Sequence, residues 1–320
     1  MKTPVVLLML SVASAPFVGG PALSQEAPPP WAYPVNPPGF KPPPDDGTLR
    51  RVPNSDLALT LTQVRDFFYA PDWHPDDHPQ MPTVVATGRK PDLLACGFCH
   101  RADGPGGPEN ANLSGLPEEY IKQQIADFKS GARKSSVMDR APMSLKMRLV
   151  GAATEAEIAE AAAYFASIKS RSIVTVIESD TAPKTYVTGW FLAADKSGET
   201  EPLGDRIIEV PDDLGRFVSR DARATFTAYV PVGSIQKGRE LAANTDKTVQ
   251  CDACHGPDLK GLDSVPGIAG RSPSYTMRQL FDFKHGARAG VASDQMKPAM
   301  EKLTVSDMIA LAAYAASLTP

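Results

Sequence analysis

Two short stretches, CGFCH at residues 96–100 and CDACH at residues 251–255, decide how the rest of this 320-residue sequence is interpreted. They contain all four cysteines of the chain, and both have the pattern Cys-x-x-Cys-His. Disulfides are the simplest alternative for four cysteines in an oxidising compartment. A thioredoxin-like pair needs a βαβ context, which neither stretch has, and a four-cysteine zinc site leaves both histidines without a role.

The pattern Cys-x-x-Cys-His is the attachment signature of c-type haem. Two thiols about one helical turn apart can add across the two vinyl groups of one porphyrin, and the adjacent histidine then becomes the proximal ligand of the iron. We therefore predict two covalently bound haem c groups. The predicted attachment residues and proximal ligands are Cys96, Cys99 and His100 in the first stretch and Cys251, Cys254 and His255 in the second.

The sequence around the two stretches is duplicated. A shift of 155 residues carries the first stretch onto the second, and it carries DFKSGAR (127–133) onto DFKHGAR (282–288). A shift of 150 carries AAYFAS (162–167) onto AAYAAS (312–317), so the first copy has five extra residues between these segments. Apolar residues on a helical period predict helices in both copies.

The helix that opens each copy is expected to differ. GSIQKGRELAAN (233–244) predicts a full helix before the second stretch, whereas MPTVVATG (81–88) allows only a short one before the first.

With these motifs the chain resembles the two-domain, dihaem class I cytochromes c of bacterial periplasms. The resemblance covers roughly residues 80–170 and 233–320, and it rests on CxxCH, the glycine and tyrosine–glutamine spacing after it, FK-x-GAR and the last helix AAY-x-AS. DWHPDDHPQMP, GRKPDLLACGFCH, KTVQCDACHGPDLKG and GIAGRSPSYTMRQL also resemble a narrower, poorly characterised family of exported dihaem proteins. The resemblance implies a mainly α fold with two tandem class I cytochrome c domains.

In this family the second axial ligand is usually a methionine on the loop before the last helix, and its thioether raises the haem potential relative to a second imidazole. In the second copy Met296 lies eight residues before the helix-capping Thr304, whereas Met300 lies only four before it. Met296 is therefore the predicted ligand.

In the first copy the segment VMDRAPMSLKMRLVGAAT (137–154) holds three methionines before the capping Thr154. Met147 lies seven residues before this threonine and Met143 lies eleven before it. We predict Met147 as the ligand, with Met143 as the alternative because of the five extra residues. Met138 is expected to pack on the surface or in the core.

Three histidines lie outside the two stretches. His74 and His78 flank two aspartates in the proline-rich segment WHPDDHP, which could bind a metal or reach a haem. A rigid surface loop with hydrogen-bonded histidines is the simpler interpretation. His285 is expected to be a solvated cation near a helix end.

The resemblance also implies groups that support the haem. A backbone carbonyl orients the ligating imidazole, and in the family this carbonyl matches Pro266 in VPGIAG, where the first copy has Ala111. Arg133 and Arg288 are candidates to pair with haem propionates. The alternative for both arginines is a cation at a helix C-terminus.

Residues 1–24 have the layout of a secretory signal peptide with cleavage after Ser24, and a retained N-terminal anchor is the alternative. No other stretch is apolar enough to span a bilayer. The chain has 33 basic and 37 acidic residues, and without Lys2 the balance is 32 against 37, or −5. This charge disfavours nucleic acid as a partner, and the leader predicts a periplasmic location.

Two segments do not belong to the duplicated unit. Residues 25–79 are crowded with proline and predict an extended arm and loop, either disordered or lying over the first haem domain. Residues 171–232 contain short β-rich runs. We expect a small antiparallel β element there, with Trp190 and Phe191 in its core, that clamps the two haem domains together.

The predicted function is transfer of single electrons. The expected partners are periplasmic redox proteins, with a dehydrogenase as the donor and an oxidase or another cytochrome as the acceptor. A dihaem peroxidase or a sulfur-compound dehydrogenase is the first alternative, and it requires an open or labile iron position. A cytochrome subunit fixed within a larger dehydrogenase is the second alternative.

Overall fold

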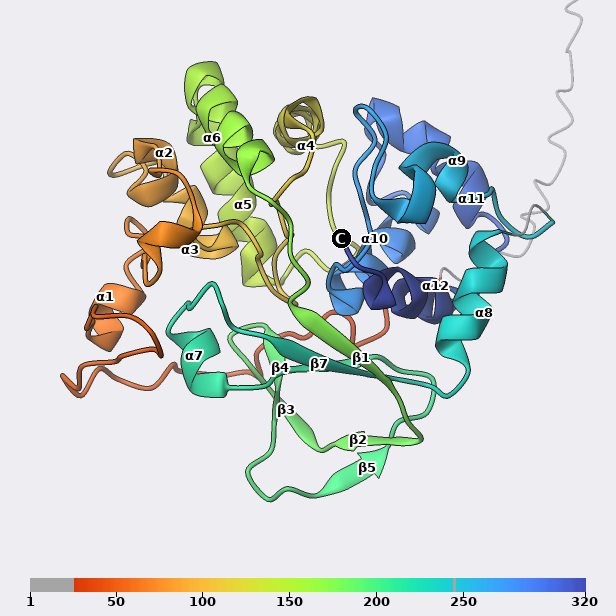
Figure 1. Cartoon of the computed structure of the whole chain (residues 1–320), viewed down its shortest axis with the longest axis horizontal. Coiled ribbons are helices and arrows are strands. Elements are labelled where there is room, and N and C mark those ends of the chain that lie inside the picture. The colour runs from red at the N-terminus through yellow and green to blue at the C-terminus, as the bar shows by residue number, and fades with distance from the viewer. Residues whose placement is uncertain (1–25, 244–245) are drawn as a thin grey trace, which may run out of the picture.

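The structure is a computed structural model, and it describes residues 26–243 and 246–320. The predicted signal peptide lies outside these residues. Two groups of helices stand side by side over a β layer (Figure 1). In the described part of the chain, no helix is both long and apolar enough to cross a membrane.

The first helical group carries the CGFCH stretch. Its buried core includes Val85, Leu93, Ile121 and Phe165. The helices are α2 (Thr83–Ala86), α3 (Cys96–His100), α4 (Glu118–Ser130), α5 (Ala141–Ala152) and α6 (Glu155–Ser167).

The second helical group carries the CDACH stretch. Its buried core includes Met277, Phe281, Leu303 and Met308. The elements are α8 (Ser234–Ala242), α9 (Asp252–His255), η2 (Pro257–Leu259), α10 (Pro273–Lys284), η3 (Val291–Gln295), α11 (Lys297–Met300) and α12 (Val305–Ser317).

The two groups repeat the same helices at the predicted shifts. The helix α12 begins and ends 150 residues after α6, and both helices begin with a capping box. In each box a threonine hydroxyl accepts from the backbone N–H three residues on, while the acidic side chain there accepts from the threonine N–H. The opening helices differ as expected, because α8 has nine residues and α2 only four.

The β layer contains three small sheets within the described residues, so the fold is helix-rich with β elements. One sheet has the order β1-β7-β6, and β2 pairs with β5 and β3 with β4. The elements of this segment are β1 (Val174–Glu178), β2 (Thr181–Pro183), β3 (Thr185–Thr188), β4 (Phe191–Ala194), β5 (Thr200–Pro202), β6 (Ile208–Pro211), α7 (Leu214–Val218) and β7 (Phe226–Val230).

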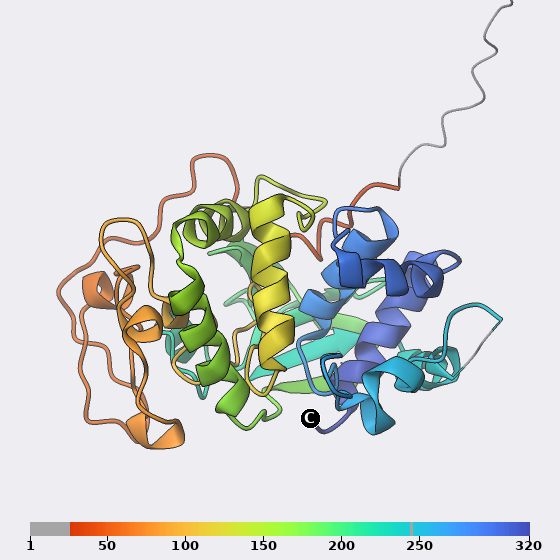
Figure 2. The same cartoon turned by 90° about the horizontal axis from the view of Figure 1, so that it is seen from above.

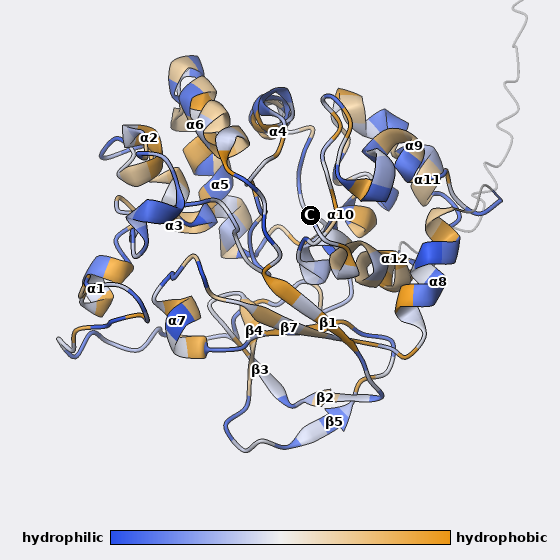
Figure 3. Cartoon of the chain, viewed as in Figure 1, coloured by the Kyte–Doolittle hydropathy of each residue, from blue (hydrophilic) through white to orange (hydrophobic). Residues whose placement is uncertain are grey.

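The expectation of a purely antiparallel element is wrong for one pair. Strands β1 and β7 run parallel, with Val174 opposite Phe226, while β6 and β7 are antiparallel. A parallel return needs a long connection, and the whole of β2 to α7 supplies it. Apolar residues are concentrated along β1 and β7 (Figure 3). Phe191 is buried as predicted, whereas Trp190 is only partly buried, at a turn with φ +70°.

The β layer contacts both helical groups. Arg220 donates to the carbonyl of Phe98 in α3 at 2.9 Å. Glu209 in β6 accepts from the Ser272 hydroxyl at 2.7 Å and from the Ser274 N–H at 3.0 Å, at the start of α10. The segment therefore contacts both helical groups.

The proline-rich arm is ordered over the described residues and lies mainly in extended or turn conformations. It contains α1 (Leu61–Val64) and η1 (Pro75–Asp77). Tyr33 is buried in the second core, and its hydroxyl donates to Asp282 at 2.8 Å. The arm runs from the second helical group past the first (Figure 2), so it contacts the second group in addition to the first.

Candidate haem-binding site

A cavity of about 380 Å³ lies between the two helical groups. It is lined by residues of both copies, so that the two Cys-x-x-Cys-His stretches open into one space. Five of the six predicted attachment and proximal residues line it, namely Cys96, Cys99, His100, Cys254 and His255. The sixth, Cys251, is partly buried and packs against the second core.

The two imidazoles are oriented in the same way. His100 Nδ1 lies 2.8 Å from the carbonyl oxygen of Ala111, and His255 Nδ1 lies 2.8 Å from that of Pro266. A ring N–H that donates to a carbonyl leaves Nε2 with the free lone pair that a metal requires. Burial lowers the pKa of His100 to about 3 and also lowers the pKa of His255, so both rings are neutral at pH 7.

The four thiols are all unpaired, so the disulfide alternative is wrong. Cys96 and Cys99 lie one turn apart on α3, and Cys251 caps α9, which contains Cys254. Both helices begin at the Cys-x-x-Cys-His pattern and end at its histidine. In each copy, therefore, a single helical turn carries two thiols and one imidazole.

The wall before the last helix differs between the copies. In the second copy Met296 lines the cavity. In the first copy α5 contributes Pro142, Leu145, Lys146, Leu149 and Val150.

Neither Met147 nor Met143 is among the residues that line the cavity, although both lie on α5 and are partly buried. Met138 is 45% exposed. The structure therefore does not place a methionine of the first copy in the wall that contains His100, and Met147 stays a prediction.

Lys146 is the residue that motif-based reasoning missed. Its ammonium lies 5.0 Å from the ring centroid of Phe128, which lines the same cavity. A signal was present in the sequence, because Lys146 lies eight residues before Thr154, as Met296 does before Thr304.

Arg133 and Arg288 also line the cavity, and they connect the two copies through a near-symmetrical set of hydrogen bonds. Arg133 donates to Gln124 of its own copy at 2.7 Å. It also donates to Tyr275 at 3.0 Å and to Gln279 at 2.8 Å, both in the other copy.

Arg288 repeats this arrangement with the copies exchanged. It donates to Gln279 of its own copy at 3.1 Å. It also donates to Tyr120 and to Gln124 of the first copy, each at 2.8 Å. Both arginines are buried at the contact between copies, a role that the sequence did not indicate.

A family model described as cytochrome c matches residues 235–319. Over 79 residues the chain is 34% identical to cytochrome c-554(548) of Halomonas halodenitrificans, a match that covers 24% of this chain and 95% of that protein.

The chain belongs to the cytochrome c family.

Two longer relatives span both copies of this cytochrome. The thiosulfate dehydrogenase electron acceptor of Stutzerimonas stutzeri strain A1501 is 25% identical over 234 residues, which cover 72% of this chain and 82% of that protein. Cytochrome c4 of Azotobacter vinelandii is 25% identical over 224 residues, which cover 68% and 82% respectively. As a dihaem c-type cytochrome, the protein carries covalently bound haem c.

The residues around the cavity fit this cofactor. Thiols and neutral imidazoles are the donors that haem c requires. Within the described residues, the Nε atom of Arg288 is buried without a hydrogen-bond partner, although the side chain lines the cavity. A carboxylate such as a haem propionate would provide the missing acceptor.

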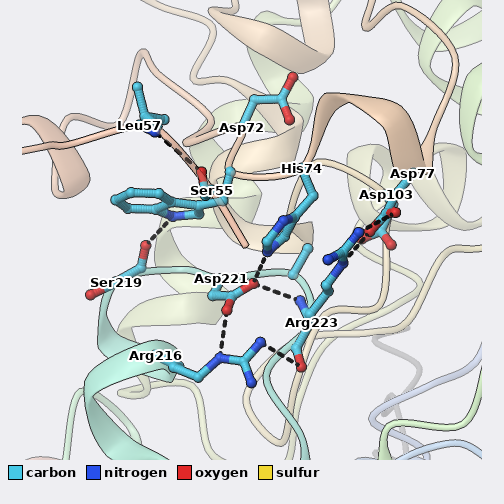
Figure 4. A network of polar contacts seen from close by, with 12 residues as sticks. Ser55, Leu57, Asp72, His74, Asp77, Asp103, Arg216, Ser219, Asp221 and Arg223 are labelled. Atoms are coloured by element: carbon cyan, nitrogen blue, oxygen red, sulfur yellow. Dashed lines mark hydrogen bonds and ion pairs between the residues drawn. The ribbon is translucent and has the colours of Figure 1, made fainter. Parts of the chain in front are cut away.

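The WHPDDHP segment does not contribute to the cavity. His74 Nε2 lies 3.0 Å from Asp221 Oδ1, and Arg216 donates to the other oxygen of the same carboxylate at 2.6 Å (Figure 4). His78 lies 3.2 Å from Asp72 and 3.0 Å from the hydroxyl of Tyr164. The loop of hydrogen-bonded histidines is confirmed, but His74 is buried rather than at the surface.

His285 also differs from its expectation as a solvated cation. Its side chain is 12% exposed, and its ring lies 4.1 Å from that of Phe281 between centroids. Burial lowers the pKa of His285, which favours the neutral ring at pH 7.

Proposed function

We propose that this cytochrome is a periplasmic dihaem electron carrier that accepts single electrons from a dehydrogenase and passes them to an oxidase or another cytochrome. The observation that carries the proposal is the single cavity into which both Cys-x-x-Cys-His stretches open. Bound haem iron supplies reversible one-electron chemistry. The chain supplies attachment, axial ligands and a buried environment that sets the potential.

The proposed roles follow the donor chemistry of each side chain. Cys96 and Cys99 would hold one haem and Cys251 and Cys254 the other, with His100 and His255 as proximal ligands. The carbonyls of Ala111 and Pro266 keep each imidazole in one tautomer. We assign Met296, which lines the cavity, as the second axial ligand of the second haem.

The proposed domains are 80–170 and 233–320, with residues 25–79 as an arm and 171–232 as the connecting segment. Arg133 and Arg288 support this division, because each binds its own copy and the other across the shared wall. Placed there, the two guanidinium groups would pair with haem propionates.

A dehydrogenase as the electron donor is favoured by the relative from Stutzerimonas stutzeri, a thiosulfate dehydrogenase electron acceptor. The same relative favours a second candidate, a cytochrome that stays bound to a dehydrogenase. Co-purification of the exported protein with a dehydrogenase subunit separates this candidate from a free carrier.

The test uses the matured holoprotein. Rapid mixing of the reduced protein with an oxidised acceptor cytochrome should oxidise both haems, and the reduced protein should not bind carbon monoxide. Carbon monoxide binding to a native haem, together with turnover of peroxide or thiosulfate without a second protein, would favour an enzyme over a carrier.

A further inference from the structure

The two walls before the last helices can be compared residue by residue. The capping residues Thr154 and Thr304 begin α6 and α12 at a shift of 150. Under the same shift, Lys146 corresponds to Met296, since each lies eight residues before its threonine. The five extra residues of the first copy must therefore lie before α5, between residues 134 and 140.

The structure supports this register independently of the sequence. Pro142, Leu145 and Lys146 line the first side of the cavity. Their counterparts at a shift of 150, residues Ala292, Gln295 and Met296, line the second side. The lysine thus takes the place in the wall that the methionine takes in the other copy.

The surroundings of Lys146 are those of a ligand rather than of an ion pair. The side chain is partly buried, and its ammonium faces the ring of Phe128. Leu145 and Leu149 line the same wall. Among the residues that the structure describes, the ammonium contacts the ring of Phe128 rather than a carboxylate, and an ammonium in apolar surroundings is costly.

We propose that Lys146 is the distal iron ligand of the first haem, in place of Met147. The inference rests on the proposed function, because it requires a haem at His100. On binding, the ammonium releases one proton to solvent, and the nitrogen lone pair forms the bond to iron.

The consequence is a difference between the two haems. An amine is a harder donor than a thioether and favours the ferric state, so the first haem would have a lower potential than the haem ligated by Met296. An electron that enters at the first copy would then move downhill to the second.

The experiment measures the long-wavelength thioether-to-iron charge-transfer band of the oxidised holoprotein, after the haem content per chain has been determined. The wild-type protein should show the intensity of one thioether-ligated haem for every two haems. Lys146→Met should increase this band about twofold, because both irons then have a thioether. Met296→Ala should remove the band.

Two matched variants test the competing ligands. Met147→Leu and Met143→Leu should leave the band and the first potential unchanged. A wild-type band with the intensity of two thioether-ligated haems, halved by either leucine variant, would overturn the proposal. So would an unchanged spectrum of the first haem in Lys146→Ala. The test does not depend on whether the variants fold, because the band intensity of the wild-type protein alone distinguishes one thioether-ligated haem from two.

The proposed function fails in a different way. A chain that matures with fewer than two haems contradicts the dihaem carrier whatever the band shows, whereas two haems with two thioether ligands contradict only Lys146.

Discussion

In the first copy the wall before the last helix is the continuous helix α5, whereas in the second copy it is divided into η3 and α11 with Met296 between them. On the proximal side the copies agree much more closely, since both histidines have the same carbonyl contact at 2.8 Å. Attachment of haem c requires one arrangement of thiols and imidazole, but the distal ligand is free to vary and sets the potential. The two copies thus agree at the thiols and the proximal imidazole, which haem attachment requires, and differ at the distal wall.

The largest expected effect comes from removing one attachment pair at a time. Cys96→Ala with Cys99→Ala, and Cys251→Ala with Cys254→Ala, should each lose one of two haems by mass. The second double variant should lower the unfolding temperature more, because the second core extends into the arm through Tyr33 and into the β-layer cluster through Ala316. Equal losses of stability would contradict this difference between the copies.

The next effect concerns the contact between the copies. Arg133→Ala and Arg288→Ala should each destabilise the protein by about 1–3 kcal/mol, because the buried Gln124 and its partly buried glutamine and tyrosine neighbours lose hydrogen bonds. The double variant should cost less than the sum, since Gln124 and Gln279 are shared by both arginines. Denaturant unfolding measures this, with the exposed Arg148→Ala as the control. Additive losses would show that the two arginines act independently.

A smaller effect is expected at the capping boxes. Thr154→Ala and Thr304→Ala should each cost roughly 1 kcal/mol, because a helix N-terminal N–H loses its acceptor. The loss should be larger for Thr304, whose partner Asp307 is 2% exposed and also pairs with Lys237 and Lys247. Thr→Ser at each site is the control. A larger loss at Thr154 would contradict the comparison.

The smallest effect is a pH dependence in the first copy. The hydrogen bond from Arg89, followed by that from the Thr154 N–H, lowers the pKa of Glu157 to about 2. A folded-state pKa below the unfolded value stabilises the protein above the unfolded pKa, and this stability is lost as the pH falls from about 4.5 towards 2. Glu157→Gln should therefore flatten the acid side of the stability profile. An unchanged dependence of stability on pH in Glu157→Gln would show that Glu157 does not contribute to it.

Much of the fold followed from local signals in the sequence. The repeat, the capping threonines and the short opening helix of the first copy were predictable because caps and helical periodicity depend on neighbouring residues. The parallel pairing of β1 with β7 was not, because it depends on where a long connection returns. The burial of His74 and Tyr33 likewise depends on partners that lie more than a hundred residues away.

The candidate site, too, was predictable only where local sequence determines it. The attachment residues could be predicted because one turn of helix contains the whole pattern. The distal wall could not be assigned by residue type, since a search for methionine passes over Lys146. The Arg133 and Arg288 cluster was also missed as a contact between copies, because a helix-end arginine is usually solvated. The burial of both arginines depends on hydrogen bonds to the other copy, which the local sequence does not show.

If each copy holds one haem at the shared cavity, the haem content of the matured, exported protein must show it. Pyridine haemochrome analysis combined with intact mass should give two covalently attached haems for each polypeptide. A fully matured chain that carries no haem, or only one, would show that the two copies do not each hold a haem.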